Sequence, residues 1–121
     1  IPKYHMMFIS LTYIKVKSIW KVPAFMIHVS RINQQIAEAE GVMATRLKGG
    51  LSKNYTMTAW ESKAAMLNFR NHGAHLEAMK STRYLSDEYT SCHYEADSLP
   101  AWKEALKMVH EKLASGSIKM G

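Results

Sequence analysis

His75 is the side chain whose type and position are best suited to chemistry. It follows Gly73 on a predicted helix, and an imidazole that titrates near neutral pH can act as a base, an acid or an iron ligand. His72 lies three residues earlier, a spacing that places both rings on one helical face and is compatible with metal binding. No third ligand of suitable spacing accompanies the pair, so we predict no metal site. A surface or helix-packing role for His75 is the alternative.

Five further side chains are candidates to bind a small molecule beside His75. Trp60 and Phe69 offer flat rings that can stack on a planar ligand, although aromatic residues are also ordinary core fillers. Met79 is one of nine methionines, whose flexible thioethers suit an adaptable apolar pocket and suit gap filling in a core equally well. The predicted set is His75 as catalytic residue and Ser10, Arg46, Trp60, Phe69 and Met79 as substrate-binding residues.

Arg46 alternates with Val42 and Ala44 on a predicted strand. If this face points inward, the guanidinium must meet a carboxylate of the protein or of a ligand, because an unpaired buried charge is costly. If it points outward, Arg46 is a solvated surface charge, and this orientation is preferred. On another strand, Cys92 and His93 are neighbours that point to opposite faces, so they cannot act together as nucleophile and base.

The elements that must position these residues follow from periodicity and from turn signals. β-Branched and aromatic residues favour strands, apolar stripes at spacings of three and four favour helices, and proline or serine marks where a helix begins. Ser62 is predicted to cap the N-terminus of a helix, and Gly73 is expected to kink or split that helix. The predicted strands cover residues 7–17, 42–48, 55–61 and 87–95, and the predicted helices begin at Pro23, Ser62 and Pro100 and end near Gly41, beyond Met79 and at Gly116.

This order predicts an α+β, ferredoxin-like βαββαβ domain with an extra C-terminal helix, spanning residues 7–113. In the split βαβ arrangement, both crossover helices lie on one face of an antiparallel sheet. Both faces of the first strand carry apolar residues, so we expect a second copy of the chain to cover the remaining face. Residues 1–6 fit no element and are interpreted as a non-native remnant or a disordered start, and residues 114–121 as a flexible tail.

Composition bounds the classes of function. The 121 residues carry a net charge of +6, but the lysines and arginines are spread along the chain, so no nucleic-acid partner is predicted. The positive field could attract an anionic substrate. No apolar run is long enough for a membrane helix, no secretory pattern appears, and the single Cys92 cannot form an internal disulfide, so a cytoplasmic location is expected. No phosphate-binding loop, dinucleotide fingerprint or nucleophile elbow occurs.

Two sets of residues resemble a known superfamily. The stretch MTAWESKAAMLNF at 57–69, followed by Gly73-Ala74-His75, resembles the third-strand and second-helix signature of the dimeric α/β-barrel superfamily, which includes the antibiotic biosynthesis monooxygenases. The segments MFIS at 7–10 and LPAW at 99–102 are most similar to an uncharacterised group near spheroidene monooxygenase. The signature is more specific for the fold than for any reaction.

The resemblance implies a homodimer whose sheets stack face to face, with a small-molecule cleft between sheet and helices in each subunit. It implies an oxygenase that acts on a flat apolar substrate without a cofactor. His75 would then be the base whose proton abstraction lets a substrate carbanion react with oxygen.

Two alternatives stay open. One is a haem-binding protein with His75 or Met79 as axial ligand. The haem-degrading members carry an asparagine, a tryptophan and a histidine at the positions that match Ser10, Phe69 and Met79 of this chain, so haem degradation is not expected. The other is a non-catalytic dimeric binding module whose cleft is simply a packed core.

Overall fold

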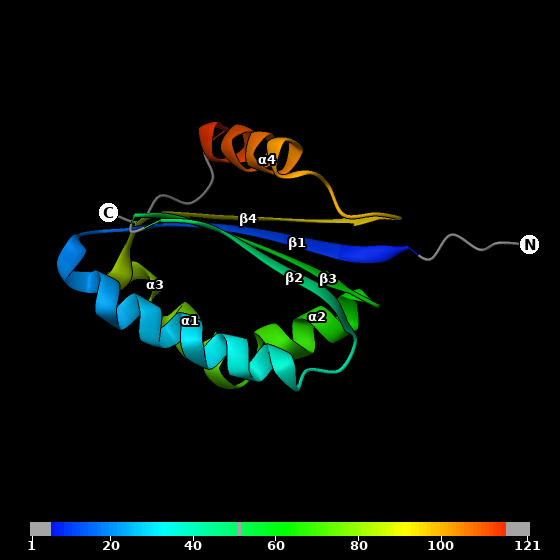
Figure 1. Ribbon diagram of the computed structural model, residues 1–121, viewed down its shortest axis with the longest axis horizontal. Coiled ribbons are helices and arrows are strands. Elements are labelled where there is room, and N and C mark those ends of the chain that lie inside the picture. Colours follow the sequence, from blue (N-terminus) through cyan, green and yellow to red (C-terminus); the bar gives the residue numbers. More distant parts are fainter. Residues whose placement is uncertain (1–5, 51, 116–121) are drawn as a thin grey trace, which may run out of the picture.

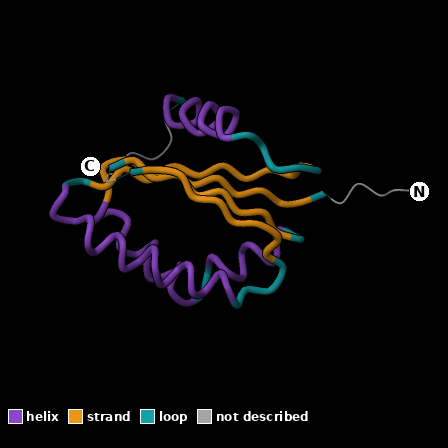
Figure 2. The backbone as a smooth tube through the Cα atoms, in the orientation of Figure 1, coloured by secondary structure: helices purple, strands orange, loops and turns teal. Residues whose placement is uncertain are grey.

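A four-stranded sheet separates two layers of helices in the computed structural model, which describes residues 6–50 and 52–115 (Figure 1). Figure 2 shows the last helix alone on one side of the sheet and the other α-helices together on the opposite side. In chain order the elements are β1 (Met7–Val16), the short 3-10 helix η1 (Ile19–Lys21), α1 (Val22–Ala37), β2 (Val42–Gly49), β3 (Lys53–Trp60), α2 (Lys63–Arg70), α3 (Gly73–Leu85), β4 (Ser86–Ala96) and α4 (Trp102–Ala114).

The sheet has the strand order β2-β3-β1-β4, with every neighbouring pair antiparallel. This confirms the predicted ferredoxin-like α+β fold. The predicted second helix is two helices, α2 and α3, because Gly73 takes a φ of 59°, a left-handed conformation that glycine adopts without steric cost. Ser62 caps α2 as expected, since its Oγ accepts a hydrogen bond from the Ala65 amide at 3.1 Å.

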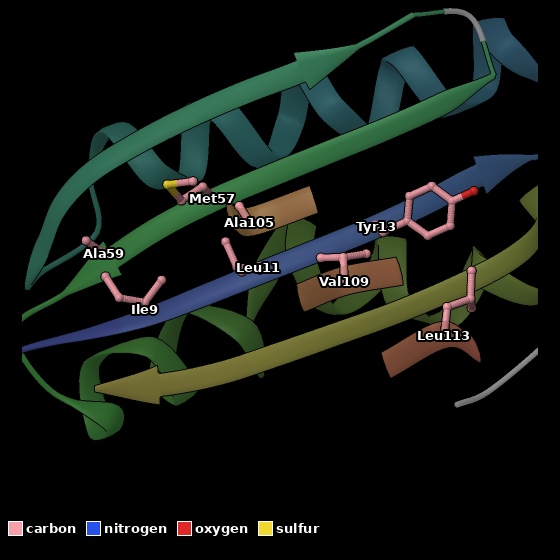
Figure 3. Close-up of a cluster of buried hydrophobic side chains, with 8 residues drawn as sticks. All are labelled: Ile9, Leu11, Tyr13, Met57, Ala59, Ala105, Val109 and Leu113. Atoms are coloured by element: carbon pink, nitrogen blue, oxygen red, sulfur yellow. The ribbon is translucent and has the colours of Figure 1, made fainter. Parts of the chain in front are cut away.

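The main core lies between the sheet and α4. Side chains at alternate positions of β1 and β3 meet the apolar stripe of α4, and all eight members of the cluster are buried. Figure 3 shows them: Ile9, Leu11, Tyr13, Met57, Ala59, Ala105, Val109 and Leu113.

The expectation that this sheet face stays open for a second subunit is therefore corrected. The chain's own α4 lies over it, because the stripe at Ala105, Val109 and Leu113 and the apolar face of β1 bury one another. The predicted end of α4 at Gly116 and most of the expected tail lie outside the described residues, as does the expected N-terminal remnant apart from the exposed Met6. Among the residues described, no helix is both long and apolar enough to cross a membrane.

Candidate functional site

A cavity of about 130 Å³ lies between the other face of the sheet and the layer formed by α1, α2 and α3. Its floor carries hydroxyl groups from neighbouring strands, because Ser10 is paired with Thr58 and Thr12 with Thr56 across β1 and β3. The remaining alternate positions of β1 face α4, so strand alternation separates the polar cavity floor from the apolar core.

The roof of the cavity is mostly apolar. The α1 stripe at Phe25, Val29, Ile32 and Ile36 faces the sheet, as its spacing predicts. Met66, Phe69 and Met79 add side chains from α2 and α3. The cavity therefore offers an apolar surface to one face of a flat ligand and hydrogen-bonding groups to the opposite side.

Trp60 and Phe69 lie against each other among the residues that line the cavity. Their ring centroids are 5.0 Å apart, and Trp60 is fully buried. The indole Nε1 donates a hydrogen bond to Thr58 Oγ1 at 2.9 Å, which satisfies the one polar atom of the indole ring.

His75 enters the cavity from the first turn of α3. Its ring meets Phe69 edge to face at 5.0 Å, and its Nδ1 is buried without a hydrogen-bond partner among the described residues. Burial, and then the charge of Arg70, lower the pKa of His75 from 6.5 to about 4. The imidazole is therefore neutral at physiological pH, and its Nδ1 is left without a hydrogen-bond partner among the described residues.

Gln35 on α1 fixes the joint between α2 and α3. Its Nε2 donates to the carbonyl oxygens of Phe69 and His72, both at 2.9 Å, and its Oε1 accepts from the His75 amide at 2.8 Å. These bonds join α1 to the end of α2 and to the start of α3, and they give an acceptor to the His75 amide, which lies in the first turn of α3 where amides lack helical acceptors. The position of His75 thus depends on a side chain 40 residues earlier.

Five of the six predicted site residues line this one cavity: Ser10, Trp60, Phe69, His75 and Met79. Arg46 does not. A bulge between Val42 and Ala44 shifts the register of β2, so that Val42 pairs with Trp60 whereas Arg46 pairs with Met57. Arg46 is exposed on β2 and is not one of the lining residues, which agrees with the outward orientation preferred from the sequence. The binding roles of the other four and the catalytic role of His75 stay predictions.

Sequence reasoning missed several lining residues. The hydroxyl floor could have been found from the alternation Ser10-x-Thr12 and Thr56-x-Thr58, since small polar residues that repeat at every second position of an inner strand are unusual. His28, expected on a helix flank, also lines the cavity. No sequence signal separated Arg70 from an ordinary surface charge.

His93 lies on the cavity side of β4, whereas Cys92 faces α4, with its Sγ 4.0 Å from the Met108 carbonyl oxygen. This confirms their predicted opposite orientations. Burial, followed by the charges of Arg70, Lys112 and Lys63, lowers the pKa of His93. Burial also raises the pKa of the Cys92 thiol.

The side chains of His72 and His75 do not lie together on one helical face. His72 is exposed at the N-cap of α3, with its Nδ1 2.6 Å from the Asn68 carbonyl oxygen, whereas His75 points into the cavity. No cluster of three or more metal-ligating side chains occurs in the described part of the chain.

The chain is similar in structure to several known proteins. A solved antibiotic biosynthesis monooxygenase superposes with a TM-score of 0.64 at 9% identity, over 78% of this chain and all of the other (100%). A Nitrosomonas europaea protein described as a candidate member of that group gives 0.64 at 15% identity, over 79% and 94%. Another Nitrosomonas europaea protein, of unknown function, gives 0.65 at 16% identity, over 82% and 99%. No family model and no curated protein sequence matches the chain. At these identities the likeness establishes the fold.

Proposed function

We propose that this chain, which has the fold of the antibiotic biosynthesis monooxygenases, is a small-molecule oxygenase that acts on a flat, mostly apolar substrate in the helix–sheet cavity. One observation carries the proposal: the side chain of His75 lines a cavity large enough for a ligand, and its buried Nδ1 has no hydrogen-bond partner among the described residues. A core packed solid by Trp60, Phe69 and the methionines would instead favour a non-catalytic binding module.

The size and lining of the cavity limit the substrate. A closed apolar cavity of roughly 150 Å³ accommodates benzene, so about 130 Å³ corresponds to one aromatic ring, with larger molecules projecting from the opening. The hydroxyl floor would form hydrogen bonds with oxygen substituents of the ring, while the apolar roof covers the opposite ring face. A phenol has both features.

The proposed reaction begins with proton transfer to His75. The substrate O–H bond breaks, its proton passes to the imidazole, and the phenolate ring becomes electron-rich enough to reduce oxygen. A C–O bond forms at a ring carbon that carries hydrogen, and the protonated His75 returns its proton to the resulting peroxide anion. The hydroperoxide then loses water to leave a carbonyl. The net change is one phenol plus O₂ to one quinone plus H₂O. A base with a lowered pKa removes only a fairly acidic proton, which favours a phenol over an unactivated C–H group.

Oxidation of 1-naphthol to 1,4-naphthoquinone under ¹⁸O₂ tests this proposal. We expect quinone formation with one labelled oxygen, abolished in His75→Ala and unchanged in the matched control His72→Ala, whose side chain is exposed. Circular dichroism checks that both variants keep the fold. Turnover retained by His75→Ala would contradict the assignment of His75 as the base. The absence of turnover with a range of one-ring and two-ring phenols would contradict the proposal that the protein is an oxygenase.

Haem is not part of the proposal. His75 and Met79 both line the cavity, but a porphyrin joins four pyrrole rings and the volume corresponds to about one ring. Purified protein should therefore show no Soret band after hemin is added and the excess removed. A stable Soret band that is lost in His75→Ala would restore the haem alternative.

We also propose that the working form is a homodimer. Ile19 is 66% exposed and Trp20 is 88% exposed, and large apolar side chains at a surface mark interaction sites. Light scattering after size exclusion should give a dimer for the wild type, a shift to monomer for Trp20→Ser, and no shift for Leu47→Ser, a control at an exposed apolar residue on β2. A monomeric wild type at high concentration would contradict the dimer.

A further inference from the structure

Arg70 is a cation at the cavity that the proposed chemistry leaves unused. It is the last residue of α2, it is half-buried, and it belongs to the cavity lining. No carboxylate lies within 4.0 Å of its guanidinium among the described residues, where the only ion pair joins Lys80 to Glu77 on the surface of α3. Partial burial of a guanidinium costs free energy when no carboxylate pairs with it, so a bound carboxylate would be favoured at this position.

The charges around Arg70 strengthen this point. The charge of Arg70 acts on both His75 and His93, which line the same cavity and are both held toward their neutral forms. Lys63 and Lys112 also act on His93. Glu95 lies two residues beyond His93 on the same face of β4, but it is exposed and does not pair with Arg70. This end of the cavity is therefore positive and uncompensated within the described chain.

We infer that Arg70 binds the carboxylate of a one-ring aromatic acid whose ring occupies the cavity. The guanidinium fork matches a carboxylate with two parallel hydrogen bonds, a geometry that an ammonium group cannot reproduce. The ring would lie between the apolar roof and the hydroxyl floor, as argued above. The inference rests on the proposed function only in taking this cavity as the ligand site, and it narrows the substrate class to aromatic carboxylates.

Arg70 also has a structural role that a test must separate from binding. A cation in the last turn of a helix interacts favourably with the carbonyl end of the helix dipole, so its removal costs some stability without any ligand. Arg70→Met keeps the length of the side chain and removes its charge. Arg70→Lys keeps the charge and removes the fork, so it retains the helix-end interaction.

Calorimetric titration with benzoate and with its neutral isostere benzamide tests the inference. We expect wild type to prefer benzoate, Arg70→Met to lose roughly tenfold to a hundredfold in benzoate affinity with little change for benzamide, and Arg70→Lys to fall between. Arg46→Met is the matched control, since Arg46 is exposed on β2 and does not line the cavity, and it should bind both compounds like the wild type.

Several results would overturn the inference. Equal affinity of wild type for benzoate and benzamide would exclude carboxylate recognition while leaving an aromatic site in place, so the proposed function would survive. Inorganic phosphate that binds as tightly as benzoate would mean a general anion site. If Arg70→Met does not fold, full benzoate affinity in Arg70→Lys would exclude the forked contact. If neither aromatic compound binds, the proposed function fails together with the inference.

Discussion

The side-chain amide of Gln35 on α1 accepts a hydrogen bond from the backbone amide of His75 on α3, over 2.8 Å. The same side chain donates to two carbonyl oxygens at the end of α2, so one residue holds both sides of the helix break. This arrangement fixes the backbone of the candidate base at the junction between α2 and α3.

Replacement of Gln35 should therefore disturb both stability and the site. Gln35→Met keeps the bulk of the side chain but removes three hydrogen bonds, one of them from the His75 amide, and we expect a loss of about 1–3 kcal/mol in the free energy of unfolding. Urea denaturation measures the loss, and amide NMR shifts should change most around residues 69–75. Gln34→Met, at an exposed position of the same helix, is the control. Equal midpoints for the two variants would argue against the role of Gln35.

The lowered pKa of His75 predicts that acid destabilises the fold. Between pH 6.5 and about pH 4 the unfolded chain binds a proton at this site that the folded chain does not, so the free energy of unfolding falls as the pH falls through this window. Near pH 5 the contribution is about 2 kcal/mol relative to neutral pH.

His75→Gln removes this contribution. Its urea midpoint should therefore fall less than that of the wild type between about pH 7.5 and about pH 5, and His72→Gln should behave like the wild type. An NMR titration of the His75 ring gives the folded-state value directly. A ring that titrates near 6.5 in the folded protein would contradict the burial argument.

Thr58 supports Trp60 inside the cavity wall. Thr58→Val keeps the shape of the side chain but removes the oxygen that accepts the indole N–H, and an unpartnered buried donor costs about 1–3 kcal/mol. The control is Thr45→Val, at the exposed cross-strand neighbour of Thr58 on β2, and it should change stability little. Thermal or urea denaturation distinguishes the two, and tryptophan fluorescence should shift only in the first. An unchanged spectrum and stability in Thr58→Val would mean that the bond contributes nothing.

Tyr55 and His110 connect α4 to the sheet. The phenol oxygen and Nε2 are 2.8 Å apart, and both rings contact Tyr13. In a double-mutant cycle with Tyr55→Phe and His110→Ala, we expect a coupling energy of about 0.5–1.5 kcal/mol. Tyr84→Phe, at an exposed tyrosine, is the control for loss of a phenol group. Additive effects of the two substitutions would show that the Tyr55–His110 hydrogen bond does not contribute to stability.

Local patterns predicted the fold well because the spacing of apolar residues in each strand and helix indicates which face is buried. The alternation along β1 and the stripe at Phe25, Val29, Ile32 and Ile36 are properties of neighbouring residues, and the structure confirms both. The cleft itself was implied by the resemblance to the dimeric α/β-barrel superfamily, and the five residues assigned to it, Ser10, Trp60, Phe69, His75 and Met79, all line the cavity.

The remaining features depend on tertiary relationships that periodicity does not encode. The stripe of α4 shows that the helix needs an apolar partner, but it does not specify which sheet face, or whose, supplies that partner. The orientation of Arg46 depends on a one-residue bulge in β2. The position of Arg70 at the cavity depends on where α2 ends over the sheet, which no local pattern reveals.

The position of α4 also determines when the main core can form during folding. Ile9 and Val109 share one cluster although about a hundred residues separate them, and contacts this distant in sequence close slowly. During synthesis, the apolar face of β1 therefore stays exposed to water until Trp102–Ala114 has left the ribosome. During that interval the nascent chain is exposed to self-association, and it is then that assistance from a chaperone would matter most.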